Sequence, residues 1–369
     1  MKVILSMMVF AFTFGVIVLT QKQDNITQKD FPFFVGTYTK GESEGIYKYI
    51  LKNDGVLEKV GLAAKISNPS FLTITDDRKF LISVDESKEG MVEAFRIEGD
   101  ELKSINKQSS GGEYPCFIGV NKKGFVTTAN YGNGTIGLLK IDAEGKLEGP
   151  LDILQHTGSG TTSRQKGPHA HSVWFRNNGK EIVSVDLGTN EIWFSNLDAK
   201  NGKLVSQNPQ KLAMSDGAGP RHMTFHPTKK WAYVLNELSS TVTFIENESS
   251  KAYQIVSSIS TLPDNFDQPN SCADIHISED GKFLYASNRG HDSIVIFQIN
   301  QKDGTLSLVG HEKTRGETPR NFNLSPDNRY LLVANQKTNS IVSFKRNGDT
   351  GKLEFVSEIE APTPVCIMF

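Results

Sequence analysis

The chain repeats one phrase about every 50 residues, and this repeat limits its possible folds more than any other feature. Each copy begins at or near a proline with an apolar stretch, turns through Asp, Asn, Gly or Lys, and continues with a second apolar stretch that ends in Asn or Asp. The second stretches end, 45 to 56 residues apart, at Asp85, Asn130, Asp186, Asn236, Asn288 and Asn335. Four-stranded propeller blades have a period of about 40–50 residues. The repeat therefore predicts six complete blades.

The two ends of the chain supply the parts of a seventh blade. Residues 363–369 have the pattern of a first strand with nothing after it, while residues 33–38, 45–50 and 55–57 resemble a second strand, a third strand and the start of a fourth. Pairing these fragments closes the ring and leaves only short, protected strand edges. We therefore predict an all-β fold over residues 33–369: a seven-bladed β-propeller with four antiparallel strands per blade. A solenoid would need capping repeats in place of two complementary fragments.

The first 32 residues have a different character. Lys2 precedes an apolar stretch over residues 3–19, which is followed by a polar run at residues 21–25. This pattern predicts a signal peptide or an uncleaved N-terminal anchor at residues 1–20, followed by a linker at 21–32. We therefore expect a protein exported to the periplasm or the extracellular space, either soluble or tethered by that segment, with no other membrane association.

Charge and cysteine content exclude several classes of function. The chain has 40 Lys and Arg residues against 42 Asp and Glu residues, a formal charge of -2, so it has no basic surface of the kind that nucleic acids require. Its three cysteines are odd in number and widely spaced, which fits neither a closed disulfide framework nor a CxxC metal clip. A nucleic-acid partner is therefore not expected, and the oligomeric state is left open.

The repeat also predicts where a site lies. In a blade, the first strand lines the central channel and the second returns beside it, so the start of the first and the end of the second meet at one mouth. The residue after the proline position precedes the end of the second strand by 15 residues in five copies, which predicts that His171 pairs with Asp186 and Arg221 with Asn236. One mouth thus gathers the candidate residues His171, Arg221, Glu237, Arg289 and Arg320, with His169 and His222 beside them.

Residues that break the repeat are better functional candidates than those that follow it. The Asn or Asp at each strand end is expected to cap the turn backbone, which is a structural role. The position after the proline, by contrast, varies around the ring as Ser, Cys, His, Arg, Ala, Arg and Val, and a packing role would favour one type. A structural alternative exists for four candidates: Glu237 as an ion-pair partner of Arg221, Arg289 as a brace, and His169 and His222 as hydrogen-bonded supports.

A metal site is the less favoured interpretation of the histidines. His169, His171 and His222 could together hold a divalent cation, but no carboxylate motif accompanies them and the neighbouring arginines would repel a cation. The loop from Gly158 to Arg164 is rich in Gly, Ser and Thr but lacks the lysine and the following helix of a phosphate-binding P-loop. We therefore expect neither a metal nor another cofactor at this site. We also expect the loop from Gly158 to Arg164 to be able to cover the mouth.

At these positions the chain resembles the β-propeller lactonase family, typified by bacterial 6-phosphogluconolactonase and including fungal carboxymuconate cycloisomerases. The resemblance spans residues 33–369. The matching phrases are Phe34-Val35-Gly36-Thr37-Tyr38-Thr39, Gly167-Pro168-His169-Ala170-His171-Ser172-Val173, Asp186-Leu187-Gly188, Gly219-Pro220-Arg221-His222, Asn236-Glu237-Leu238, Ser287-Asn288-Arg289-Gly290 and Pro319-Arg320-Asn321-Phe322. The resemblance implies a seven-bladed fold, metal-independent chemistry on a small-molecule lactone, and a site at His171, Arg221, Glu237 and Arg289, with Arg320 as a further member.

Lactone hydrolysis suits these residue types. A neutral His171 can act as general base toward water, because an unperturbed imidazole has a pKa near ~6.5, with Glu237 orienting it or shuttling the proton. One arginine would stabilise the oxyanion and the others would bind an acidic or polyhydroxylated substrate. Two alternatives stay open: a muconate-type lactone-forming cycloisomerase, and a non-catalytic propeller that binds a carbohydrate or protein partner. The expected export leaves the natural lactone open.

Overall fold

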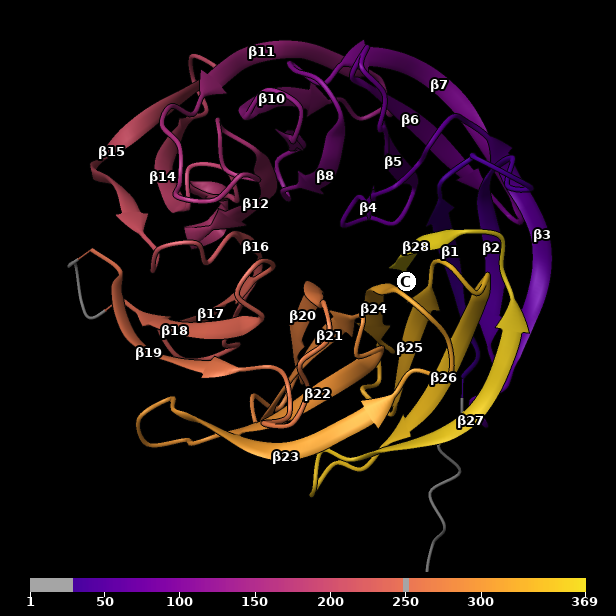
Figure 1. Ribbon diagram of the computed structural model, residues 1–369. Helices are drawn as coiled ribbons and strands as arrows, with labels where there is room; N and C mark the ends of the chain where they lie inside the picture. Colours follow the sequence, from indigo (N-terminus) through magenta and orange to yellow (C-terminus); the bar gives the residue numbers. More distant parts are fainter. Residues whose placement is uncertain (1–28, 248–251) are drawn as a thin grey trace, which may run out of the picture.

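The chain forms a closed ring of seven four-stranded antiparallel sheets, as predicted (Figure 1). The computed structural model describes residues 29–247 and 252–369. The innermost strands are β4 (Leu72–Ile74), β8 (Pro115–Val120), β12 (Ala170–Arg176), β16 (Pro220–Phe225), β20 (Ser271–Ile277), β24 (Pro319–Leu324) and β28 (Pro364–Met368). The second strands are β1 (Phe31–Thr37), β5 (Phe80–Asp85), β9 (Phe125–Asn130), β13 (Glu181–Asp186), β17 (Trp231–Asn236), β21 (Phe283–Arg289) and β25 (Tyr330–Asn335).

The outer half of each blade consists of a third and a fourth strand. The third strands are β2 (Gly45–Leu51), β6 (Met91–Glu98), β10 (Thr135–Ile141), β14 (Glu191–Asp198), β18 (Thr241–Glu246), β22 (Ser293–Ile299) and β26 (Ser340–Arg346). The fourth strands are β3 (Leu57–Lys65), β7 (Glu101–Ser109), β11 (Leu147–Gln155), β15 (Lys203–Ala213), β19 (Gln254–Ser260), β23 (Leu306–Lys313) and β27 (Leu353–Glu360). A single turn of 3-10 helix, η1 (Asn177–Gly179), joins β12 to β13.

The two ends of the chain share one blade, as the sequence predicted. Strand β28 is the innermost strand of the sheet ordered β28-β1-β2-β3, and it pairs with β1 through Phe34 and Met368, Val35 and Ile367, and Gly36 and Cys366. Figure 1 shows the yellow β28 beside the indigo β1 near the ring axis. Noncovalent pairing of these two strands therefore closes the ring.

The N-terminal boundary differs slightly from the expected one. Strand β1 begins at Phe31, which pairs with Leu51, and Asp30 forms an ion pair with Lys52 at 2.9 Å. The last residues of the expected linker at 21–32 therefore belong to the folded domain. The expected signal peptide or anchor at 1–20 lies outside the described residues. Within residues 29–247 and 252–369, no helix combines the length and the apolar character needed to cross a membrane.

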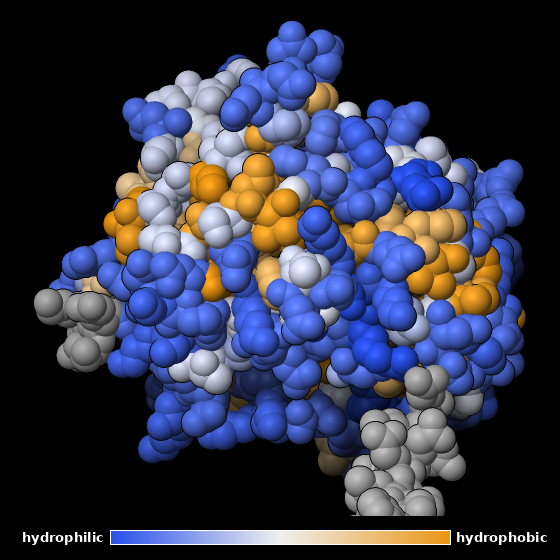
Figure 2. Space-filling view, turned by 90° about the horizontal axis from the view of Figure 1, so that it is seen from below, coloured by the Kyte–Doolittle hydropathy of each residue, from blue (hydrophilic) through white to orange (hydrophobic). Residues whose placement is uncertain are grey.

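The hydrophobic core lies between the blades. Seven clusters of buried apolar side chains occur in the described part of the chain, one at each contact between neighbouring blades. In one of them, Tyr233 and Leu235 of β17 pack with Leu284 of β21 and Phe297 of β22. The second and third strands are mostly buried, as in β17 and β22, whereas the fourth strands are largely exposed, as in β7 and β19. Seen from below, the edge of the ring is accordingly hydrophilic with hydrophobic areas between (Figure 2).

At four of the turns before a fourth strand, a glycine fits against an aromatic ring of the preceding blade. Gly304 has a φ of +76°, and a Cβ added there would lie 2.5 Å from Cζ of Phe244. The hydroxyl of Tyr233 also donates a hydrogen bond to the carbonyl oxygen of Gly304 at 2.7 Å. Gly55, Gly145 and Gly351 meet aromatic rings of their own preceding blades in the same way. These four glycines therefore allow neighbouring blades to pack closely.

We expect the Gly304→Ala substitution to lower the free energy of unfolding by about 1–3 kcal/mol, because it adds both backbone strain and a clash with Phe244. Equilibrium unfolding in urea measures the change. Gly348→Ala is the control, since a Cβ there meets nothing within 4 Å. Equal stability of the two variants would show that this contact does not hold the blades together.

Candidate active site

Several side chains of the site lie at bulges in the pairing between the first and second strands of a blade. Pro220 pairs with Asn236 and His222 with Leu235, so Arg221 has no partner in the ladder. His171 and Arg320 occupy the corresponding bulges of β12 and β24. A bulge residue leaves the regular alternation of the strand, which re-aims its side chain. Here the three side chains line the channel.

The predicted strand pairing was wrong by one residue. Asp186 pairs with Ala170 and not with His171, and Asn236 pairs with Pro220 and not with Arg221. The bulge is the physical reason, because it places one extra residue on the innermost strand opposite the end of the second strand. The variable position after the proline is thus the bulge position itself.

A polar cavity of about 310 Å³ opens at this mouth of the channel. Bulge residues from the innermost strands line it, together with residues at or just after the ends of second strands and one residue of a loop. The lining residues are Glu86, Cys116, Tyr131, Arg164, His171, Glu237, Ser271, Arg289 and Arg320. The cavity has the size of a small-molecule site, in which a few convergent polar groups fix the ligand.

Glu237 is the centre of the charged groups. Its Oε2 atom lies 3.0 Å from Nε of Arg221 and 3.0 Å from Nη2 of Arg289, and its Oε1 atom lies 3.3 Å from Nη2 of Arg164. Burial raises the pKa of Glu237, but the charges of Arg289, Arg221 and Arg164 outweigh burial and lower the pKa to about 2. The carboxylate is therefore ionised and holds the guanidinium groups in place.

Backbone carbonyl groups fix two of these arginines further. Arg289 donates from Nη2 to the carbonyl oxygen of Cys272 at 2.8 Å and from Nε to that of Ser271 at 3.3 Å, while Arg221 donates to the carbonyl oxygen of Ala273. Burial lowers the pKa of Arg289 to about 10, so it stays charged at neutral pH. Both guanidinium groups are thus charged, buried and held rigidly.

Arg320 belongs to a second group on the opposite side of the site. It donates to the hydroxyl of Tyr38 at 2.9 Å, and that hydroxyl donates to Oε2 of Glu86 at 2.8 Å. Burial raises the pKa of Tyr38, which keeps the phenol protonated and able to donate. Arg320 therefore faces the cavity without a carboxylate in direct contact.

His171 is a neutral imidazole in this cationic setting. It is buried, and burial together with the charge of Arg221 holds its pKa well below the ordinary value. The Sγ atom of Cys116 lies 3.6 Å from its Nδ1 atom. Burial also raises the pKa of the Cys116 thiol, so this cysteine is protonated and is no thiolate nucleophile.

His169 and His222 occupy different places. Nδ1 of His169 lies 2.8 Å from the carbonyl oxygen of Tyr131, and the two rings stack at 4.6 Å. His169 lines neither cavity of this mouth and supports Tyr131. His222 lies deeper, where Nδ1 is 2.8 Å from Oδ1 of Asp274. The structure thus places six of the seven predicted residues on the walls of the channel and His169 behind them.

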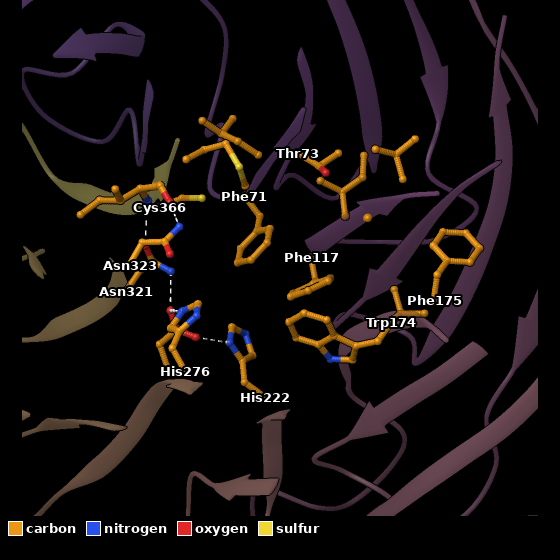
Figure 3. A pocket seen from close by; sticks show the side chains of 18 residues that line it. Phe71, Thr73, Phe117, Trp174, Phe175, His222, His276, Asn321, Asn323 and Cys366 are labelled. Carbon is orange, nitrogen blue, oxygen red and sulfur yellow. Dashed lines mark hydrogen bonds and ion pairs between the residues drawn. The ribbon is translucent and has the colours of Figure 1, made fainter. Parts of the chain in front are cut away.

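The far half of the channel is aromatic. Its cavity of about 310 Å³ is lined by Phe71, Phe117 and Trp174, with Phe71 and Phe117 stacked at 4.3 Å (Figure 3). Figure 3 also shows the chain of hydrogen bonds through His222 and Asn321 on the opposite wall. Phe71, His222 and Asn321 line both this cavity and the space below the arginines. These three side chains therefore separate the two halves.

Arg164 is a site residue that the sequence did not identify. It lies in the loop between β11 and β12, where it also donates to the hydroxyl of Tyr131 at 3.0 Å. The neighbouring Gln165 is buried and donates to the carbonyl oxygen of Leu187 and to Asn190, which anchors the loop at the mouth. The sequence predicted a loop that can cover the mouth, and the loop does lie there, but its composition does not show that Arg164 turns toward Glu237.

Tyr38, Glu86 and Tyr131 were also not assigned to the site, although a signal for them existed. Each directly follows the end of a second strand, as Glu237 does. The register that places Glu237 at the mouth therefore also places Tyr38, Glu86 and Tyr131 there.

The charged groups leave a positive excess. Four guanidinium groups and two carboxylates line the mouth and the space below it, which is an excess of two positive charges. A site of this charge suits a ligand with a phosphate or carboxylate group, which arginine can bind through two parallel hydrogen bonds. Across the described residues, no group of three or more His, Cys, Asp or Glu side chains has the arrangement of a metal site.

The buried histidines predict a loss of stability in acid. Burial, and then the charge of Arg221, lowers the pKa of His222 from 6.5 to about 4. The unfolded chain gains a proton below about pH 6.5, whereas folded His222 stays neutral, so the free energy of unfolding should be about 2 kcal/mol lower at pH 5 than at pH 7.5 from this residue. Urea unfolding at the two pH values measures the difference, and equal or greater stability at pH 5 would contradict it.

Comparison with known proteins agrees with this architecture. The family model described as lactonase, 7-bladed beta-propeller, matches residues 32–369. The chain is 38% identical to a 6-phosphogluconolactonase of Bacillus subtilis over 295 residues, which cover 78% of this chain and 83% of that protein. It is 39% identical to a 6-phosphogluconolactonase of Formosa agariphila over 304 residues, covering 78% of this chain and 85% of that protein.

A solved structure shows the same relationship in three dimensions. The periplasmic gluconolactonase of Pseudomonas aeruginosa superposes with a TM-score of 0.88 at 28% identity, over 92% of this chain and 99% of that one. The match thus extends over the whole ring, including the blade that the two ends of the chain share. The chain belongs to the seven-bladed β-propeller lactonase family.

Proposed function

We propose that this protein hydrolyses sugar-type lactones that carry an anionic group, with 6-phosphogluconolactone as the model substrate. The observation that carries the proposal is the excess of two positive charges around the small-molecule-sized cavity and the space directly below it, in a chain of the lactonase family. The relatives from Bacillus subtilis and Formosa agariphila are both named 6-phosphogluconolactonase. A phosphorylated lactone has the charge and the size that this mouth accommodates.

Each residue of the site has a role in this reaction. Arg221, buried and held by Glu237, is placed to stabilise the oxyanion that forms when water adds to the lactone carbonyl. Neutral His171 accepts the proton of that water. Arg289, Arg320 and the more exposed Arg164 bind the anionic group and the hydroxyl groups of the substrate.

The role of Glu237 in this proposal differs from the one expected from the sequence. Its ion-pair partners are arginines, at 3.0 to 3.3 Å, and not His171. A carboxylate with a pKa of about 2 is also a poor proton carrier at neutral pH. We therefore assign Glu237 to orienting the guanidinium groups.

Arg164 gives the sharpest test of the substrate class, because its side chain is 54% exposed and thus free to turn from Glu237 to a ligand. We expect Arg164→Met to raise the KM for 6-phosphogluconolactone about tenfold, since a hydrogen bond to a charged group contributes about 1.5–3 kcal/mol. The KM for unphosphorylated gluconolactone should change less than twofold. Acid release by the purified protein measures both, and Lys166→Met, in the same loop, is the matched control.

The same assay separates the alternatives. Hydrolysis of gluconolactone but not of its phosphorylated form would assign the arginines to hydroxyl groups, as in an enzyme for neutral sugar lactones. Consumption of a muconate-type substrate without acid release would indicate a cycloisomerase. If no lactone disappears faster than in buffer, the propeller is a binding protein and the proposed function is wrong.

A further inference from the structure

A second, much smaller cavity lies directly below the mouth. It leaves about 10 Å³ in which the centre of a water molecule can move, and it shares Glu86, Cys116, His171 and Arg320 with the larger cavity above. Such a space is too small for an organic ligand, but it matches the volume that one buried water requires. The small cavity therefore adjoins the substrate site and has room for about one water molecule.

Two polar atoms on the walls of this small cavity need a partner. Ser70 and His222 both line it, with exposed fractions of 5% and 3%. Among the residues that the structure describes, neither Oγ of Ser70 nor Nε2 of His222 has a hydrogen-bonding partner. Buried polar atoms are nearly always hydrogen-bonded, to protein or to ordered water. A water molecule in the small cavity would satisfy both atoms.

Asp274 determines which ring nitrogen of His222 carries the proton. Its Oδ1 atom lies 2.8 Å from Nδ1 of His222, and its Oδ2 atom accepts hydrogen bonds from Asn321 at 2.5 Å and His276 at 3.1 Å. These contacts keep Asp274 ionised, so Nδ1 of His222 carries the proton and donates it to the carboxylate. Nε2 is then an acceptor, and its orientation is fixed by the carboxylate behind the ring.

We propose that the small cavity holds the water that attacks the lactone, with Nε2 of His222 and Oγ of Ser70 as its ligands. This inference rests on the proposed hydrolysis. His222 accepts a hydrogen bond from the water, and Asp274 is a positioning residue that holds His222. His171, which borders both cavities, takes the proton as the oxygen of the water bonds to the carbonyl carbon.

The step balances without a further reactant. The water oxygen forms a bond to the carbonyl carbon, one water proton moves to His171, and the carbonyl oxygen becomes the oxyanion beside Arg221. The ring C–O bond then breaks, and protonated His171 returns its proton to the departing alkoxide oxygen. The product is a hydroxy acid, which loses its acidic proton to solvent, and His171 is neutral again.

Substitution of Ser70 tests the proposal on the full chain. Ser70→Val fills the small cavity, and we expect it to lower kcat for 6-phosphogluconolactone roughly tenfold or more, because the water is displaced from its attack position. The dissociation constant of the product, 6-phosphogluconate, should stay within twofold, since the arginines are untouched. Ser70→Ala should lower kcat less than Ser70→Val, and Ser67→Val, an exposed position in the same loop, should leave kcat unchanged.

Two results would overturn the proposal. One is a Ser70→Val enzyme with undiminished kcat; the other is a variant that loses product binding and kcat in parallel, which would indicate a structural role only. A crystal structure of the unmodified protein provides a test independent of activity, with one ordered water expected within hydrogen-bonding distance of both Ser70 Oγ and His222 Nε2. If that water is present but no lactone is hydrolysed, the hydrolytic role fails together with the proposed function, while the water site stands.

Discussion

Replacing Glu237 with glutamine is expected to lower the free energy of unfolding by about 3–5 kcal/mol, because it removes a negative charge that compensates two buried guanidinium groups at once. Arg221 and Arg289 both contact the same oxygen, Oε2, at 3.0 Å, and their side chains are only 3% and 12% exposed. A glutamine amide accepts hydrogen bonds in the same place but carries no charge. The two like charges would then repel each other in a site that excludes most water.

Urea unfolding of the wild type and of Glu237→Gln at neutral pH measures this loss. Glu358→Gln is the matched control, since Glu358 is exposed on β27, and its stability should stay within about 0.5 kcal/mol of the wild type. We also expect Glu237→Gln to lose most lactonase activity at temperatures where it is still folded. Unchanged stability would mean that the arginines find compensation elsewhere, and the central role of Glu237 would then be wrong.

Arg221→Met should lower kcat/KM for the lactone about 10²- to 10³-fold, which is the usual cost of removing one oxyanion donor. Methionine keeps the volume of the aliphatic part and removes the charge, so the loss reports on electrostatics more than on packing. A lysine at this position is expected to restore little activity, because a point charge cannot contact both Glu237 and the carbonyl oxygen of Ala273 as the guanidinium does.

Steady-state kinetics with the unfolding midpoint measured in parallel separates this effect from instability. Arg96→Met is the control, because Arg96 is exposed on β6 and bonds the carbonyl oxygen of Glu144 outside the channel. If Arg221→Met keeps more than about a third of the wild-type kcat/KM while folded, the oxyanion is stabilised by another group. Arg320 would then be the first candidate, since no carboxylate contacts it directly.

The fold could be predicted because the signal for it is distributed along the whole chain. A period of about 50 residues and two complementary terminal fragments leave few alternatives to a closed ring, and the strand ends at Asn236 and Asn335 lie where the repeat places them. The positions of Arg221 and Arg320 at one mouth followed from the same repeat. Regular repetition thus determines which side chains share a mouth, even when they are 100 residues apart.

The remaining details depend on backbone geometry and contacts that the sequence pattern does not reveal. The bulge at Arg221 recurs at His171 and Arg320, but the repeat alone does not show that one residue there leaves the strand pairing. Arg164 reaches Glu237 because buried Gln165 fixes a loop against Leu187, a contact between segments that nothing in the pattern relates. The support of His222 by Asp274 likewise joins two blades through side chains alone. Contacts of this kind cannot be predicted from the sequence pattern.

The pairing of β28 with β1 also suggests that the chain can be circularly permuted, so that it begins and ends in a different blade. Since these two strands are antiparallel neighbours held by hydrogen bonds, with Met368 opposite Phe34, a short peptide linker could connect them covalently. New ends could then be opened at an exposed turn such as the one at Gly348. A circularly permuted protein of this kind should still assemble the same channel, because the buried apolar clusters that join neighbouring sheets do not depend on where the chain begins.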